Sequence, residues 1–500
     1  MSDAVEYSNL SKPKMPGVQG LSPAQFLALI AAMFPVVLIM MFVGMWAGIA
    51  WLVLALAVLA PWIVGTMFLD TNPYSILGRR MRWSRANRKG LTTLAQGPAG
   101  MVPMGRTQLP GLAADTELVE CEDVYGQPFG LIVHRAVDHY TVVIEASPPG
   151  VTGLDQESVD LQAAHWGTYL GVLSRERDLI GAQVVVDTAP DTGLRLERAA
   201  MADVDPNAPE LARRVLEDVV AAAPAGAARI TTAVTLTFDA RRGDDRTVRD
   251  VDTMADDIGT RLPGLISQLA TTGAGTALRA RTAADIVDDT RVAFDPSVAP
   301  LVEEARQRQG GTGLSWEEAG PVSAHAARDH YSHDGSVSVS MMMVEPPRGV
   351  FYTLQLKGLL EPNARIARKR VAVLYRPTDP VRSANLAEWR VTSASADADS
   401  KRRTGASQRK LQALEAAREN ARAEAKGAPF TRVGLIVTAT IEDAENIAVT
   451  QSTLTTLSGQ ARLRLRPCWG MHDTAFVAGL PLGIVLPERL ALPAFMREGL

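Results

Sequence analysis

The sequence predicts a membrane protein in which a two-helix transmembrane hairpin is followed by cytoplasmic α+β domains. Three observations predict this class. The run Phe26–Leu69 contains no Asp, Glu, Lys, Arg or His. A cluster of arginines follows that run, and apolar residues further along alternate between the spacing of strands and the spacing of helices.

The uncharged run is about twice the roughly 20 residues that one membrane pass requires, so it fits two helices with a tight connection. The break falls at Gly44–Gly48, and Trp46 and Trp51 flank it as interfacial tryptophans would. A secretory signal peptide is excluded, because the apolar part is too long and begins too late. A buried hairpin of a soluble core is disfavoured by the same length.

Positive charge beside a membrane span marks the cytoplasmic side. Arg79, Arg80, Arg82 and Arg85 follow the hairpin with no acidic residue among them. The sequence therefore predicts a multi-pass plasma-membrane protein with both termini in the cytoplasm. Anionic lipid head groups are a second partner that this cluster would attract.

The overall charge gives no sign of a nucleic-acid partner. The 51 Lys and Arg residues against 55 Asp and Glu residues leave a net charge of −4, so no direct nucleic-acid binding is expected. The only two cysteines, Cys121 and Cys468, are far apart, which suits a reducing compartment rather than a disulfide framework.

Shifts in composition divide the chain into six parts. The expected parts are an N-terminal cytoplasmic tail, the transmembrane hairpin, a basic juxtamembrane segment with a Gly/Pro-rich linker, a first α+β domain, a second linker and a second α+β domain. Their ranges are 1–25, 26–69, 70–115, 116–308, 309–335 and 336–500.

In the first soluble domain, short β-rich runs and amphipathic helices alternate. Strands are expected at 129–133, 140–145, 182–187, 230–238 and 277–280, with helices at 158–175 and 248–269. The stretch Ile230–Phe238 alternates Thr with apolar residues, which predicts a half-buried strand. Thr282 and Asp285 predict a capping box that starts another helix. Because strand and helix order recurs, the domain is expected to be of the ferredoxin-like type.

The second soluble domain shows a similar order. Strands are expected at 336–344, 370–375, 431–440 and 461–465, with a long charged helix at 406–426 and another at 443–457. The long helix has few large apolar residues and is expected to be mostly solvated.

Catalytic and cofactor motifs are absent from the sequence. A P-loop needs a lysine directly after a glycine, and no lysine here stands in that position. The glycine-rich stretch Thr272–Gly275 is better explained as a turn. His325, His330, His333 and Asp334 match no standard metal spacing. We therefore expect no cofactor, no metal and no catalytic residue.

A few histidines leave room for a membrane-tethered enzyme of unknown reaction. His134 and His139 lie at a predicted strand end, beside Asp138, and His165 lies on a predicted helix with Asp160. A nucleophile held against one of them would be required, and no Gly-x-Ser-x-Gly elbow occurs.

The C-terminal part resembles the N-terminal, non-motor region of the hexameric ATPase of type IV secretion and conjugation systems. The segments that carry this resemblance, in the same order, are Ala327–Ser336, Arg370–Arg376, Val433–Ala439, Arg462–Pro467 and Phe476–Gly483, the last with a Gly-Leu-Pro-Leu-Gly turn. The hairpin and Asn72–Arg82 resemble the small PrgI-like two-helix inner-membrane subunit of the same systems. Proteins of this kind occur in actinobacteria.

This resemblance implies a non-enzymatic inner-membrane structural subunit that docks a separate motor ATPase. It also implies other secretion-channel subunits as partners and an oligomeric state within the complex. Two alternatives remain: an EccE-like subunit of type VII secretion, and the membrane-tethered enzyme considered above.

Overall fold

The structure is a computed structural model that describes residues 23–68, 73–97, 100, 106–150, 154–190, 204, 208–222, 228–241, 247–345, 353–363, 365–399, 408–425, 427 and 430–490. The described chain forms two compact units, and the boundary between them in the sequence lies between Thr92 and Thr93. We call residues 23–92 the helical unit and the described residues from Thr93 onward the sheet unit. Most of the expected N-terminal tail, and Leu69, lie outside the described residues.

The helical unit contains α1 (Pro23–Phe42), α2 (Met45–Phe68) and α3 (Pro73–Arg88). Gly44, with φ of +121°, makes the turn between α1 and α2, a backbone conformation that glycine adopts without strain. The indole N–H of Trp51 donates to the carbonyl of Ala32, 3.1 Å away, and ties the two helices together. The Tyr74 hydroxyl donates to the carbonyl of Val58 at 2.6 Å.

The predicted pair of transmembrane helices, and with it the multi-pass plasma-membrane location, is wrong. Within the described residues one helix, Met45–Gly65, is long and apolar enough to cross a membrane. The apolar part of the preceding helix, Ala28–Phe42, is shorter than a span requires. The turn lies at Gly44, where the break is expected, but it divides the uncharged run unequally and leaves a single helix of sufficient apolar length among the described residues.

The sheet unit is built on one sheet of 13 strands. Its strands are β1 (Thr93–Ala95), β2 (Thr116–Glu122), β3 (Pro128–His134), β4 (His139–Ala146), β5 (Leu179–Pro190), β6 (Ala228–Asp239), β7 (Arg279–Ala280), β8 (Ser323–Ala326), β9 (Tyr331–His333), β10 (Ser336–Glu345), β11 (Arg368–Pro377), β12 (Thr431–Ile441) and β13 (Arg464–Pro467). Every pairing between these strands is antiparallel.

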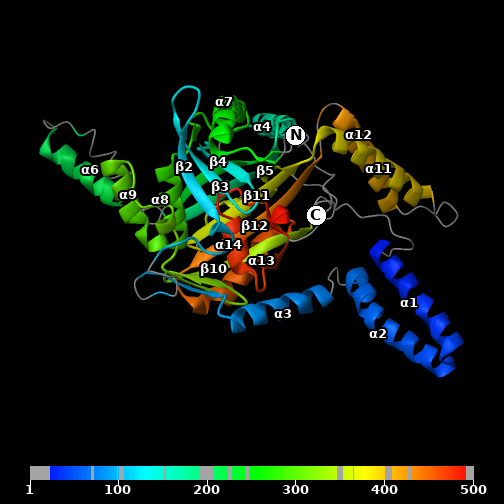
Figure 1. The fold of residues 1–500 in the computed structure, drawn as a ribbon. Coiled ribbons are helices and arrows are strands. Elements are labelled where there is room, and N and C mark those ends of the chain that lie inside the picture. The colour runs from blue at the N-terminus through cyan, green and yellow to red at the C-terminus, as the bar shows by residue number, and fades with distance from the viewer. Residues whose placement is uncertain are drawn as a thin grey trace. The chain divides into compact units, whose positions relative to one another are not determined.

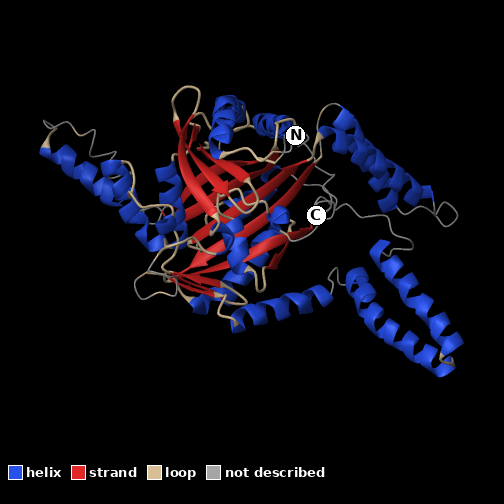
Figure 2. Ribbon diagram, in the orientation of Figure 1, coloured by secondary structure: helices blue, strands red, loops and turns tan. Residues whose placement is uncertain are grey.

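Helices of the sheet unit lie on both sides of this sheet (Figure 2). They are α4 (Gln156–Leu173), α6 (Glu210–Ala222), α7 (Val251–Ala270), α8 (Ala283–Phe294), α9 (Ala299–Gln309), α10 (Lys357–Leu360), α11 (Pro380–Asp399), α12 (Gln408–Ala425), α13 (Ile447–Gln460) and α14 (His472–Ala478), with short 3-10 turns at Gly111–Ala113, Pro296–Val298, Glu317–Ala319, Thr353–Leu356, Ala444–Asn446 and Leu486–Arg489.

Strand order divides the sheet into two similar halves. Across the sheet, the strand order of the first half is β7-β4-β6-β5 and that of the second is β13-β10-β12-β11. Along the chain, and apart from inserted helices, the elements of each half follow the order strand, helix, strand, strand, helix, strand. The halves join edge to edge where β5 pairs with β11, with Asp187 opposite Arg370 and Val184 opposite Val373. The additional helices are inserted at equivalent points of the chain. In sequence, α6 comes between β5 and β6, while α11 and α12 come between β11 and β12 (Figure 1).

The predicted fold class is therefore wrong for the soluble part as well as for the hairpin. One continuous sheet replaces the two small ferredoxin-like domains, because the edge strands β5 and β11 pair with each other. The expected linker at 309–335 contributes β8 and β9 to that sheet, so the boundary falls inside the sheet unit.

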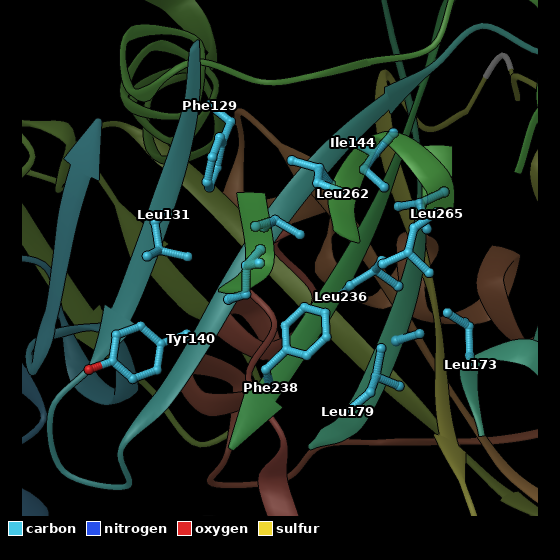
Figure 3. Close-up of a cluster of buried hydrophobic side chains, with 14 of the residues drawn as sticks. Phe129, Leu131, Tyr140, Ile144, Leu173, Leu179, Leu236, Phe238, Leu262 and Leu265 are labelled. Atoms are coloured by element: carbon cyan, nitrogen blue, oxygen red, sulfur yellow. The ribbon is translucent and has the colours of Figure 1, made fainter. Parts of the chain in front are cut away.

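One face of the sheet carries the largest apolar core. Side chains of β3, β4 and β6, including Leu131, Ile144, Leu236 and Phe238, pack against Leu173 of α4 and against α7 (Figure 3). In the second half, residues such as Val371 and Val437 pack on α10 and α13. Burying this surface is the main source of stability, at roughly 25 cal/mol per Å² of apolar area.

The opposite face is also buried, although its strands present many polar side chains. Thr141, Gln183, Thr235 and Thr237 all lie at 2% exposure or less. Helices α8 and α14 cover this face together with residues 479–489. The expectation that Ile230–Phe238 is a half-buried strand is wrong, because Thr235 and Thr237 lie on this covered face and are at most 1% exposed.

Candidate functional site

The candidate anchor is helix α2. Only 6% of its apolar stretch, within Met45–Gly65, is buried in the structure, whereas a core helix of a soluble protein would be mostly buried. Trp46, at the start of α2, is 78% exposed, and Trp51 is bonded to α1 as described above. An exposed surface of this size needs a cover that is itself apolar, and a lipid bilayer supplies one.

Helix α3 carries all four arginines that the sequence singled out. Arg80, Arg82 and Arg85 are exposed and Arg79 is partly buried. Arg82 donates through its Nε to the carbonyl of Gly78 at 3.4 Å, so it lies along its own helix. The helix contains no acidic residue, and it therefore presents a basic surface that suits anionic lipid phosphates.

His134, which the enzyme alternative requires, is fully engaged in the structure. Its Nε2 lies 2.9 Å from the carbonyl of Leu482 and its Nδ1 lies 2.8 Å from a guanidinium nitrogen of Arg489. Because a carbonyl only accepts and a guanidinium only donates, the ring is neutral with its proton on Nε2. Burial and, after it, the charge of Arg489 lower the pKa of His134 to about 4.

The remaining candidate histidines do not converge on one place. His165 contacts the carbonyl of Thr271 at 2.9 Å, from the outer surface of α4. In the later cluster, His325 contacts Thr93, His330 contacts Asp329 and His333 contacts Phe294 and Ser338. Among the residues that the structure describes, no three His, Cys, Asp or Glu side chains are grouped to hold a metal.

The Gly-Leu-Pro-Leu-Gly turn, residues 479–483, crosses the polar face of the sheet. Backbone carbonyls of this region accept from three sheet side chains: Ala478 from Gln183 at 3.0 Å, Leu482 from His134 at 2.9 Å and Gly483 from Thr237 at 3.0 Å. The turn thus satisfies polar strand side chains that would otherwise be buried without partners.

A cavity of about 430 Å³ opens on the same face, where the two halves of the sheet join. Its floor is formed by β4, β5, β6 and β11, and its other walls by α8, α9, β7 and the Leu480–Pro481 peptide. Ala189, Thr231 and Ala233 supply small side chains on the floor, and this leaves the space open.

Charged side chains dominate the walls of this cavity. The arginines are Arg229, Arg279, Arg281, Arg306, Arg368 and Arg370, and the carboxylates are Glu145, Asp187, Asp285, Asp289 and Glu303. On the helix side they form close pairs: Arg281 lies 2.5 Å from Asp289, and Arg306 lies 2.7 Å from the same carboxylate. Burial opposes ionisation of Asp289, but the two guanidinium groups outweigh it and hold its pKa below the usual value.

The strand side is less completely paired. Asp187 accepts from Arg368 at 2.7 Å and from Arg370 at 3.4 Å, both through the same oxygen, Oδ2. Burial acts to raise the pKa of Asp187, but these two arginines outweigh that effect and leave the pKa below its normal range. Arg229 lies 3.6 Å from Glu303. Within the described residues, Asp187 Oδ1, Arg370 Nη1, Arg368 Nε and Arg229 Nε have no hydrogen-bond partner.

This cavity could not be predicted from the sequence. Arg370 begins one expected strand and Asp187 ends another, but their meeting depends on the β5–β11 pairing. The usable signal was the run of three consecutive basic residues at Arg368–Arg370, which is unusual for a strand that lies in the middle of a sheet.

Comparison with known proteins supplies no relative. No protein-family model matches the chain, and no curated protein is significantly similar to it in sequence.

Proposed function

We propose that this protein is a membrane-attached, non-enzymatic docking subunit of a type IV secretion-like conjugation apparatus, which holds a separate motor ATPase at the membrane. The observation that carries the proposal is the exposed apolar helix α2, followed at once by the basic helix α3 and then by the large sheet unit. Attachment in this proposal rests on the one candidate span, α2.

The sheet unit supports the docking part of the proposal. The histidines considered for catalysis are either bonded into the fold or placed apart. The Gly-Leu-Pro-Leu-Gly turn, which the resemblance associates with the region next to a motor, is built into the sheet face through its carbonyls. A broad sheet with inserted helices offers surface to which a partner protein can bind.

The proposal is tested by purifying the tagged full chain in detergent from its native host. A motor ATPase is expected to co-purify, as identified by mass spectrometry, and the purified subunit alone is expected to turn over no ATP. A chain with a charged residue within α2 serves as a control that separates membrane attachment from ATPase capture.

Two results would contradict the proposal. Sustained ATP hydrolysis by the subunit alone would assign it an enzymatic role. Co-purification of type VII secretion components in place of a conjugation ATPase would favour the EccE-like alternative.

A further inference from the structure

We propose that the cavity at the junction of the two half-sheets binds the phosphate group of a small organic molecule. The proposal goes beyond the docking function and depends on the geometry of the sheet unit alone. It rests on the shape of the cavity, on the placement of its arginines and on the polar atoms left without partners.

The register of the strands places the binding groups in two adjacent rows. Arg370 on β11 lies opposite Asp187 on β5, and Asp187 lies opposite Thr231 on β6. In the next row Ala189 on β5 lies opposite Arg229 on β6. Arg368, two residues before Arg370 on the same strand, points to the same face because side chains alternate along a strand. Guanidinium groups from the two halves of the sheet therefore flank the small side chain of Ala189.

Charge on the floor of the cavity is unbalanced toward the positive. Arg368 and Arg370 share one carboxylate, Asp187, while Arg229 lies 3.6 Å from Glu303, so these three arginines meet two carboxylates. Glu145 is already engaged at 2.6 Å by Arg279 on β7, so it does not neutralise the other three arginines. An anion that entered the cavity would meet a net positive floor.

Unused donors indicate where the anion would bind. Arg370 is 4% exposed, and its Nη1 has no partner among the described residues, nor does Nε of Arg368 or of Arg229. A buried guanidinium N–H without an acceptor costs more free energy than a typical hydrogen bond returns. An oxyanion with several acceptor oxygens would satisfy donors from both strands, and planar guanidinium groups suit phosphate well.

The volume of the cavity indicates the size of the ligand. About 430 Å³ falls in the range of small-molecule sites and greatly exceeds what a single phosphate ion fills. Apolar contacts are available from Val185, Val302 and the Leu480–Pro481 peptide. A phosphate attached to a nucleoside or to a small polyol therefore fits better than the bare ion.

Isothermal titration of the full chain in detergent tests this site with three probes: pyrophosphate, adenosine diphosphate and glycerol 3-phosphate. At least one probe is expected to bind the wild-type protein. The probe that binds best tells a nucleotide from a polyol phosphate or from the phosphate groups alone.

Four variants make the test specific. Arg229→Gln and Arg370→Gln each remove one charge-assisted donor and are expected to weaken binding about tenfold or more. Asp187→Asn removes the competing carboxylate and is expected to tighten binding. Arg308→Gln is the matched control, because Arg308 is 73% exposed, pairs with Glu304 and lies outside the cavity wall.

Binding that is unaffected by both Arg229→Gln and Arg370→Gln would overturn the proposal, because the probe would then occupy another place. Failure of all three probes to bind either the wild type or Asp187→Asn would overturn it too. Arg370 is buried and its variant risks misfolding, so Arg229→Gln, whose side chain is 33% exposed, decides the result in that case.

Discussion

Gly483 shows how one residue fixes the path of the C-terminal segment. Its φ of +67° lies in the left-handed region, and its carbonyl accepts from Thr237 at 3.0 Å. A Cβ at this position would lie 2.4 Å from side-chain atoms of both Thr141 and Thr237. Glycine is thus required here for two independent reasons, backbone conformation and space.

Replacing Gly483 with Ala is expected to lower the free energy of unfolding by about 2–4 kcal/mol, because the new methyl group overlaps buried strand side chains and the backbone is strained. Chemical denaturation of the full chain measures the change. Gly459→Ala is the matched control, since Gly459 lies within α13 and a Cβ added there would have no atom within 4 Å. That variant is expected to leave stability unchanged or to raise it by up to about 1 kcal/mol. Equal effects of the two substitutions would contradict the steric argument.

Three buried histidines make the sheet unit sensitive to acid. Burial lowers the pKa of His134, His333 and His472 to about 4 in each case. His333 donates from Nδ1 to the carbonyl of Phe294 at 2.5 Å, and because the ring is neutral its Nε2 accepts from the Ser338 hydroxyl at 2.8 Å. His472 accepts the backbone N–H of Ser340 at 3.1 Å.

Stability is therefore expected to fall as the pH decreases from about 6.5 toward 4. In this window the unfolded histidines take up protons while the folded ones stay neutral, so each contributes a slope of up to about 1.4 kcal/mol per pH unit. His333→Gln is expected to remove the contribution of one histidine from the slope of stability against pH. The double variant that also carries His472→Gln is expected to remove the contribution of two. Denaturation midpoints collected between pH 5 and 6.5 provide the measurement. Slopes that coincide in all three proteins would show that these rings do not govern the acid response.

At the scale of elements, several helices and strands could be predicted from local chemistry. Thr282 and Asp285 form the expected capping box, and Asp250 caps α7 through the N–H of Thr253. The strands expected at 129–133 and 431–440 are β3 and β12 with slightly different ends. These succeed because capping groups and apolar periods act over a few residues.

Other elements could not be predicted, because their cause lies far away in the sequence. The short strands β8 and β9 have little apolar pattern, and they form because β1 and β10 pair with them. The prediction of two membrane passes failed for a different reason: the break lies at Gly44 as expected, but the apolar helix before it, Ala28–Phe42, is too short to span.

Helix α2 gives a direct test of membrane attachment. Leu54 lies near the middle of the Met45–Gly65 window and is 56% exposed. Leu54→Arg is expected to reduce the fraction of chain that resists alkaline extraction from membranes, since an arginine at the centre of a span costs roughly 2.5–3.5 kcal/mol. Leu54→Phe keeps an apolar side chain and is expected to behave as wild type. Full retention of the arginine variant in the membrane would show that α2 is not the anchor.

The whole molecule is organised by the junction of its two halves. Asp187, Arg370 and the cavity around them exist only because β5 and β11 pair, and the residues that form the cavity come from both halves. Neither half shows this in its own sequence, which explains why two domains were expected and why the cavity was missed. Local pattern identified several of the strands, whereas the order of strands across the sheet depends on long-range pairing.

The same junction predicts that the first half cannot fold by itself. A fragment of residues 116–308 would expose the edge of β5 and would lose Phe476, Leu480 and Leu482, which cover the apolar side chains on the polar face. An uncovered strand edge and an exposed apolar patch promote aggregation. Size-exclusion chromatography and thermal unfolding are expected to show an aggregated fragment without a cooperative transition.

The matched fragment of residues 93–490, which retains both halves, is expected to be monodisperse and to unfold cooperatively. A soluble 116–308 fragment that unfolds with the same midpoint as 93–490 would mean that the halves are independent domains, and the pairing of β5 with β11 would then contribute little to stability.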